Sequence, residues 1–168
     1  MRYNADMNPC WVHNNLAVVM DTLVTLCGHS EISQPDAVKT WLNIVTRELL
    51  SSGADIFYFG GYGAFDRLAA SVIREVKAGQ NIVKAVLVLP YLNSNIDATG
   101  YDYTVYPPLE SVPLRFAISK RNQWMVEQAD VIVAYVTHSW GGAAKTLEYA
   151  RRKKKQIILF PEARPKDL

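Results

Sequence analysis

The chain has 168 residues and a formal net charge of +2 at pH 7. Hydrophobic residues make up 49% of the chain and charged residues 20%, a composition that excludes general disorder and allows one sizeable core. The small net charge does not by itself indicate nucleic-acid binding, and no apolar segment approaches the ~20 residues that a membrane-spanning helix needs.

The cysteines, the histidines and the N-terminal sequence argue against a secreted disulfide-rich protein and against a metalloprotein. Cys10 and Cys27 are too few for a disulfide framework, and the N-terminus lacks the basic region and long apolar stretch of a secretory signal. These features predict a reduced, cytoplasmic protein. The histidines are scattered and lack clustered carboxylates or thiols, so we expect no metal site, and no motif predicts a cofactor.

Short apolar runs alternate with helix-length segments along most of the chain. Residues 1–19 carry little pattern, and we assign them to an N-terminal arm that precedes a single domain at 20–168. The apolar runs are continuous rather than alternating, as in strands that are covered on both faces. They comprise residues 22–27, 55–60, 83–90, 130–136 and 156–160.

The segments between these runs have the character of helices. Segment 35–53 opens with Pro35 and closes with Gly53, the asymmetry that is typical of helix ends. The other helical segments are 64–79, 113–129 and 143–155. This alternation predicts an α/β protein with a three-layer Rossmann-like fold and a five-stranded parallel sheet of order 3-2-1-4-5. Ligands bind such sheets beyond the C-terminal strand ends, here between strands one and four.

Polar or glycine-rich segments follow the first and second predicted strands and therefore share one edge of the sheet. After the first strand, Gly28 allows a tight exit, and His29 and Ser30 offer hydrogen-bonding groups; a plain turn is the alternative. After the second strand, glycines would let backbone amides approach a ligand, namely Gly60, Gly61 and Gly63. Asp66 would then accept hydrogen bonds from ribose hydroxyls, or only complement the dipole of its helix.

A third segment, "THSWGGAAKTLEYA" (137–150), follows the fourth predicted strand. Gly141 and Gly142 precede a helix whose free N–H groups favour an anion, and Thr146 would add a hydroxyl. Glu148 is open to two interpretations. It belongs either to the site or to a surface salt bridge with Arg152, four residues later.

The helix before the fourth strand contributes two polar residues. Asn122 interrupts an apolar stripe, and Arg121 lies at the border of that stripe. A buried amide needs partners and a half-buried guanidinium needs an anion, so we predict that Arg121 reaches the cleft and binds phosphate. A surface pair with a neighbouring carboxylate is the alternative for Arg121.

Two further features leave more than one interpretation open. The basic run "RRKKK" (151–155) is either a solvated helix end, where cations complement the dipole, or a contact for an anion or nucleic acid. The long connection 91–113 carries several tyrosines, which either stack on a ligand or cover the edge of the sheet.

Four stretches together resemble the SLOG superfamily, and its small, single-domain YpsA-like branch in particular. They are "VTLCGHSEI", "GGYGAFDRLAA", "RNQWMVEQADVIVAYV" and "GGAAKTLEYARRKKKQII", and the resemblance covers roughly residues 20–160. It implies a Rossmann-like fold that binds a nucleotide or a nucleotide-derived ligand at the strand tips. For this branch it implies no known reaction.

The same superfamily contains the LOG-type phosphoribohydrolases, whose motifs are Arg-Lys-x-x-Met and Pro-Gly-Gly-x-Gly-Thr-x-x-Glu. Arg121 and Met125 match the first motif, with Asn122 at the lysine position. Matches to the second are Gly141, Gly142 and Glu148; departures are Trp140, Ala144 and Lys145. The related deoxyribosyltransferases carry their glutamate nucleophile where this chain has Thr146, which disfavours that chemistry.

Three functions follow as expectations. The first is binding or sensing of a nucleotide-derived small molecule: Gly141, Gly142 and Thr146 would hold phosphate, which Arg121 would neutralise. Asp66 would hold ribose, and Tyr and Trp side chains such as Trp140 would stack on the base. The alternative is nucleoside 5′-monophosphate hydrolysis by Glu148 and Arg121. The third is single-stranded DNA binding. The LOG-type resemblance also favours a homodimer.

Overall fold

The computed structural model describes residues 22–78 and 82–161. The predicted arm at 1–19 lies outside the described residues. Strands and helices follow one another as β1 (Thr22–Gly28), α2 (Pro35–Ser51), β2 (Ala54–Phe59), α3 (Gly63–Val76), β3 (Lys84–Val88), β4 (Tyr103–Val105), α4 (Leu114–Gln128), β5 (Val131–Tyr135), α5 (Gly141–Arg152) and β6 (Gln156–Leu159).

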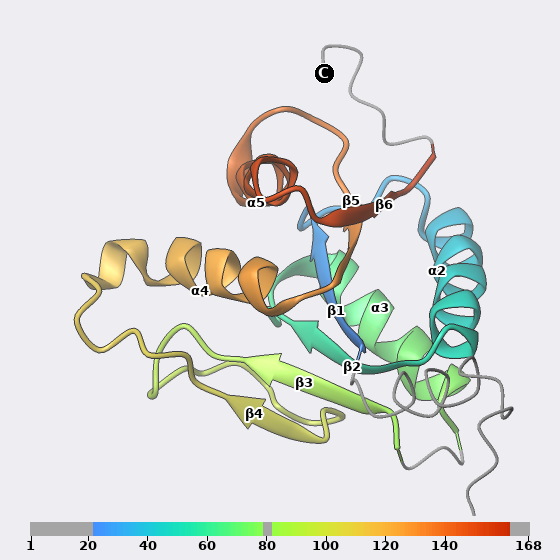
Figure 1. The fold of residues 1–168 in the computed structure, drawn as a ribbon, viewed down its shortest axis with the longest axis horizontal. Helices are drawn as coiled ribbons and strands as arrows, with labels where there is room; N and C mark the ends of the chain where they lie inside the picture. The colour runs from blue at the N-terminus through green and yellow to red at the C-terminus, as the bar shows by residue number, and fades with distance from the viewer. Residues whose placement is uncertain (1–21, 79–81, 162–168) are drawn as a thin grey trace, which may run out of the picture.

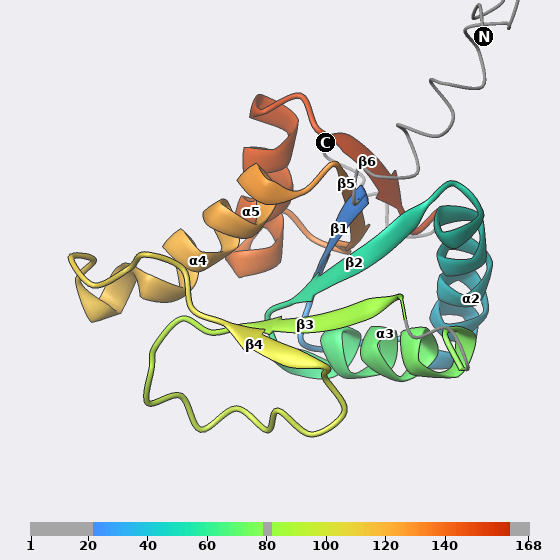
Figure 2. The same ribbon diagram turned by 60° about the horizontal axis from the view of Figure 1, so that its bottom comes forward.

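A single parallel sheet forms the middle layer, with the order β4-β3-β2-β1-β5-β6 (Figure 1). The predicted apolar runs correspond to β1, β2, β3, β5 and β6, and their predicted order is confirmed. Helices α2 and α3 cover one face of the sheet and α4 and α5 the other (Figures 1 and 2). The three-layer Rossmann-like class is therefore confirmed.

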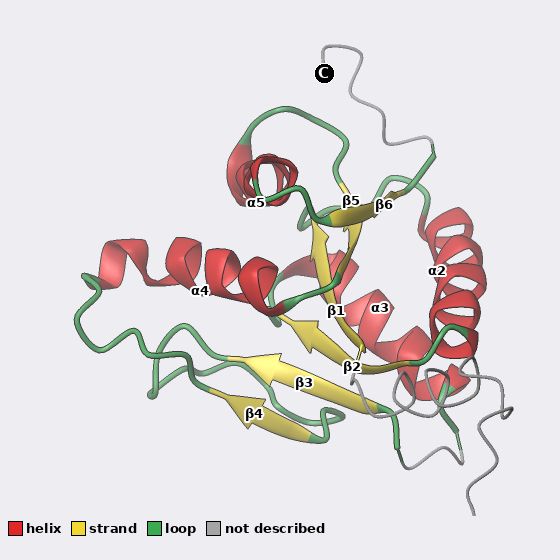
Figure 3. Cartoon of the chain, in the orientation of Figure 1, coloured by secondary structure: helices red, strands yellow, loops and turns green. Residues whose placement is uncertain are grey.

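The prediction of five strands was wrong by one, because the connection 91–113 contains β4. This strand extends the sheet edge through the pairs Val86↔Tyr103 and Val88↔Val105. Asp102, just before it, accepts a hydrogen bond from the Ala85 N–H at 2.6 Å and so fastens the segment to β3. With three residues that are mostly exposed, β4 has no apolar run by which it would be recognised (Figure 3).

Both faces of the sheet are packed with apolar side chains, which explains the continuous apolar strands. One cluster joins β1, β2 and β5 to α2 and α3, where Phe65, Ala69 and Ile73 form a stripe at helical spacing. The other joins β1 and β5 to α4 and α5. No helix among the described residues is long and apolar enough to cross a membrane.

Helix α4 buries a different face from the one predicted. Its buried residues are Ala117, Arg121, Met125 and Val126, whereas Ile118 is 41% exposed. Arg121 therefore lies within the buried face and not at its border. In Figure 1 the N-terminal part of α4 extends beyond the sheet, away from the body of the protein. A helix that packs over only part of its length has a weak apolar pattern. For this reason the sequence predicted the wrong buried face for α4.

Candidate functional site

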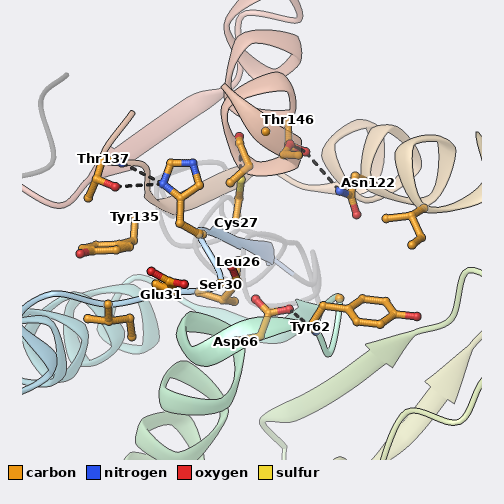
Figure 4. Close-up of a pocket in the computed structure, with 18 of the residues that line it drawn as sticks. Leu26, Cys27, Ser30, Glu31, Tyr62, Asp66, Asn122, Tyr135, Thr137 and Thr146 are labelled. Atoms are coloured by element: carbon orange, nitrogen blue, oxygen red, sulfur yellow. Dashed lines mark hydrogen bonds between the residues drawn. The ribbon is translucent and has the colours of Figure 1, made fainter. Parts of the chain in front are cut away.

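A cavity of about 640 Å³ opens where β1 and β5 end. Its walls come from the segments after β1, β2 and β5 and from one side of α4 and α5 (Figure 4). Because β1 pairs with β2 on one side and β5 on the other, this is the switch point of the sheet, where ligands bind in open α/β folds. The sequence predicted a site at this edge.

Most of the residues predicted for a ligand site line this cavity. They are Gly28, His29, Ser30, Gly60, Asp66, Arg121, Asn122, Trp140, Gly141, Gly142 and Thr146. Gly61, Gly63 and Glu148 do not line it.

The two glycines outside the lining serve the turn before α3. Gly61 has φ +76° and Gly63 has φ +88°, a backbone region that favours glycine. A Cβ at Gly63 would also lie 2.7 Å from the Cα of Ser30, whose carbonyl accepts the Ala64 N–H at 2.9 Å. These contacts bring the segment after β2 against the segment after β1 and so shape the cavity wall.

Glu148 lies on the exposed side of α5, whereas its neighbours Thr146 and Leu147 are buried. Carboxylates that do line the cavity belong to Glu31 and Asp66. The catalytic role that the LOG-type motif suggests for Glu148 therefore has no support from its position in this fold.

Three aromatic rings form a stack at the mouth of the cavity. The centroids of His29 and His138 are 3.5 Å apart with an interplanar angle of 14°, and those of His138 and Trp140 are 3.8 Å apart at 18°. Trp140 is 70% exposed, so the outer end of the stack offers an aromatic surface to a ligand. Sequence reasoning missed His138. His138 could have been found from the predicted strand order, because His29 and His138 each follow one of two neighbouring strands. In the structure Gly28 of β1 pairs with Tyr135 of β5.

The inner histidine presents a buried donor. Nδ1 of His29 accepts the Thr137 N–H at 3.1 Å, so the neutral ring carries its proton on Nε2. Burial, with a contribution from His138, lowers the pKa of His29 below its usual value and favours this neutral form. Nε2 is buried and makes no hydrogen bond that meets normal geometry within the described residues, although the backbone of Trp140 lies near enough to oppose the lowering of the pKa.

Arg121 and Asp66 are two buried charged groups on the cavity wall that interact electrostatically. Arg121 is 2% exposed, and its Nη1 donates to the Gly60 carbonyl at 2.7 Å and to the Val88 carbonyl at 2.6 Å. The guanidinium thus joins α4 to the C-terminal ends of β2 and β3. The phosphate contact of Arg121 remains a prediction. Two of the hydrogen bonds that the guanidinium can donate are already made to backbone carbonyls of the fold.

Asp66 accepts the Tyr62 N–H at 3.2 Å (Figure 4). Burial raises the pKa of its carboxyl to about 6, and the Arg121 charge opposes this shift. The buried carboxylate therefore changes protonation state only slightly below neutral pH, inside the cavity wall.

The pH dependence of stability should report this carboxyl group. The pKa of about 6 lies above the ordinary 3.8, so the folded protein holds the proton more tightly than the unfolded chain does. The resulting stability is complete below about pH 4 and is lost as the pH rises through about 6. We expect the free energy of unfolding, taken relative to Asp66→Asn, to fall by about 3 kcal/mol between about pH 4 and pH 7. Urea unfolding of both proteins across this range measures it, and a pH-independent difference would contradict it.

Asn122 and Thr146 connect α4 to α5 beside the cavity. Asn122 Nδ2 donates to Thr146 Oγ1 at 3.3 Å, and that hydroxyl donates to the Gly142 carbonyl at 2.8 Å (Figure 4). The hydroxyl proton of Thr146 is thus used inside its own helix. The half-buried amide of Asn122 thus has a hydrogen-bond partner, as expected for a polar group in an apolar stripe.

The N-terminus of α5 opens into the same cavity. Trp140 precedes the helix and makes no side-chain capping bond, and Gly141 and Gly142 both line the cavity. The first N–H groups of a helix need acceptors, and they attract anions when no side chain supplies them. A Cβ at Gly142 would meet no atom within 4 Å, so this helix start is open.

Cys27 completes the wall as an unreactive thiol. Its Sγ lies 3.4 Å from the Ala143 carbonyl, and burial raises its pKa to about 12. The nucleophilic thiolate is therefore scarce at neutral pH. Among the described residues no group of His, Cys, Asp and Glu is placed to hold a metal ion.

The basic run after α5 is partly used within the fold. Lys155 Nζ donates to the carbonyls of Glu127 at 3.0 Å and Ala129 at 2.8 Å, at the end of α4, and Lys153 pairs with Glu127 at 3.7 Å. These contacts favour the interpretation of "RRKKK" as cations at a helix end, although the helix they complement is α4.

Solved structures that share this fold include three proteins. The protein TM1055 has a TM-score of 0.62 at 19% identity, over 86% of this chain and 76% of that protein. DNA processing protein A from Helicobacter pylori, described with its single-stranded DNA binding mode, has a TM-score of 0.61 at 14% identity, over 87% and 68%. The molybdenum cofactor carrier protein from Chlamydomonas reinhardtii has a TM-score of 0.59 at 17% identity, over 86% and 81%.

These similarities fit the Rossmann-like fold that the resemblance to the SLOG superfamily implies. Their identities are below 25%, so they establish the fold that this chain shares with them. No protein-family model matches the chain, and no curated protein matches it in sequence.

Proposed function

We propose that the cavity binds a nucleotide or a nucleotide-derived small molecule. The observation that carries the proposal is the uncapped N-terminus of α5, which opens into a cavity beside an exposed aromatic stack. The helix start would hold a phosphate group, and Trp140 would stack on a base or a similar ring. The Nε2–H of His29, which makes no well-formed hydrogen bond among the described residues, and the carboxyl of Asp66 add a donor and an acceptor in the same lining.

Binding without turnover fits this lining better than hydrolysis does. The hydrolysis that the LOG-type motif implies depends on Glu148, which is exposed and outside the lining, whereas the carboxylates in the lining, Glu31 and Asp66, do not belong to that motif. Single-stranded DNA binding has less support as well, because two residues of the basic run, Lys153 and Lys155, contact the end of α4. The homodimer stays a prediction.

A binding panel tests the proposal directly. Titration calorimetry with nucleoside mono- and diphosphates, the parent nucleosides and inorganic phosphate would show which part of the ligand is recognised. We expect nucleotides to bind more tightly than the nucleosides, and chromatography after overnight incubation should recover them intact. Equal affinity for nucleosides and nucleotides would contradict a phosphate site, and release of free base would contradict simple binding.

Gly142→Asp should separate binding from stability. An added carboxylate about 5 Å from a bound phosphate would repel it, and we expect nucleotide affinity to fall roughly 100-fold. The same charge complements the helix dipole, so the free energy of unfolding should rise by about 0.5 kcal/mol. Calorimetry and urea unfolding measure the two effects.

Gly142→Asn is the matched control, because it adds a side chain of the same size without the charge. It should retain most of the nucleotide affinity. Space is available for both side chains, since nothing lies within 4 Å of a Cβ at this position. If the asparagine and aspartate variants bind equally well, the phosphate is not at the start of α5.

A further inference from the structure

A second cavity, of about 570 Å³, lies between α3 and the segment 95–101. Its lining includes Arg67 and Arg74, which are two turns apart on α3 and therefore share one face of the helix. The opposite wall contributes Asn95, Thr99 and Tyr101. None of these residues lines the first cavity.

The two arginines have no carboxylate partner within the described part of the chain. The ion pairs found there join Lys39 to Glu75, Lys77 to Asp102 and Lys153 to Glu127. Asp97 also lines the second cavity, but its Oδ1 accepts the Thr99 N–H at 2.8 Å in a local turn. Two guanidinium groups and one carboxylate leave this cavity with net positive charge.

Tyr101 adds a neutral donor beside these charges. Its ring packs on Phe59 with centroids 5.4 Å apart, and burial raises the pKa of its hydroxyl to about 12. The hydroxyl thus keeps its proton at neutral pH. The guanidinium of Arg74 packs directly against the backbone of Gly100. A Cβ at Gly100 would lie only 2.0 Å from Arg74 Nη1.

We propose that this second cavity is a binding site for a phosphate-bearing small molecule, separate from the start of α5. Arg67 and Arg74 would bind the phosphate oxygens and Tyr101 would donate to them, since guanidinium groups form forked hydrogen bonds with phosphate. A concave site of this size fits a small anion better than a nucleic-acid backbone, which needs an extended groove.

Tyr62 is the wall that the two cavities share. Figure 4 shows it at the border of the first cavity, with its ring extending away from Asp66. The two sites are therefore neighbours, yet their anion-binding groups come from different elements. This separation allows each site to be disabled without the other.

The test uses inorganic pyrophosphate as the probe and Gly142→Asp as the background, so that the first cavity does not contribute. We expect pyrophosphate to bind this variant, and the addition of Arg67→Gln and Arg74→Gln to weaken its binding at least about 10-fold. Arg47→Gln, an exposed position on α2 outside both linings, removes one positive charge and is the control for Arg67→Gln and Arg74→Gln taken singly.

Absence of pyrophosphate binding in Gly142→Asp would overturn the second site. So would equal binding with and without the two arginines, an equal loss in Arg47→Gln, or binding of a single-stranded oligonucleotide in place of pyrophosphate. The first site is judged separately, by nucleotide binding in Gly142→Asp and Gly142→Asn with both arginines intact.

Discussion

Replacing Arg121 by methionine should lower the free energy of unfolding by about 3–5 kcal/mol, a large fraction of the stability of a domain of this size. The substitution keeps much of the side-chain volume but removes the charge and the donors. It leaves the carbonyls of Gly60 and Val88 without the bonds of 2.7 and 2.6 Å that they now accept, and it leaves Asp66 buried without its positive neighbour. Urea unfolding monitored by circular dichroism measures the loss.

A second variant makes this result specific to the buried pair. Lys120→Met changes the neighbouring residue, which is exposed on α4, and should alter stability by no more than about 0.5 kcal/mol. Combining Arg121→Met with Asp66→Asn should cost less than the sum of the two single changes, because the carboxyl no longer lacks a partner. A loss below about 1 kcal/mol in Arg121→Met would mean that the guanidinium is not needed for the fold.

The expected loss affects how binding experiments are interpreted. An alanine or methionine at position 121 that abolishes nucleotide binding would do so even if the guanidinium never touches the ligand, because the cavity wall depends on it. Gly142 is a better position to test, since it lines the cavity and its substitution disturbs no packing. The predicted phosphate role of Arg121 requires a variant that stays folded.

The sheet and its edge were predictable from the sequence because both depend on local pattern. Continuous apolar runs identify strands that are covered on both faces, and residues that follow parallel strands must share one edge. His29, Asp66 and Gly141 thus come together in one lining, as expected. Strand β4 gave no such pattern, because its three residues are held by pairing with β3 and by Asp102.

Details of the site depended on contacts that no local pattern records. The stack of His29, His138 and Trp140 follows from the register of β1 against β5, which is a property of the assembled sheet. Arg121 was predicted at the border of a helix face, but α4 is rotated so that this residue is buried. Glu148 matched a motif at the right spacing, and yet the helix turns it to the solvent-exposed side.

Gly28→Ala should destabilise the protein by about 2 kcal/mol. A Cβ at this position would lie 2.2 Å from Cδ1 and 2.7 Å from Cβ of Phe65. Phe65 is fully buried and stacks on Tyr135 with centroids 5.8 Å apart, so it has no free space to move into. Overpacking of this kind costs about 1–3 kcal/mol, and the lower entropy of the unfolded alanine chain offsets up to about 1 kcal/mol of it.

Gly142→Ala makes the same chemical change at a position where no atom lies within 4 Å of the added Cβ. There we expect the free energy of unfolding to rise by up to about 1 kcal/mol. The two variants should therefore differ by about 3 kcal/mol in urea unfolding, and the sign of each change is part of the prediction. Equal effects on the free energy of unfolding would show that the close approach of β1 to Phe65 is not required.

The contact between Gly28 and Phe65 also bears on binding, because Phe65 stacks on Tyr135. Tyr135 lines the cavity, and its hydroxyl shares a hydrogen bond of 3.3 Å with the Ser33 hydroxyl. Displacing Phe65 would move this wall, so nucleotide affinity should fall in Gly28→Ala while it is retained in Gly142→Ala.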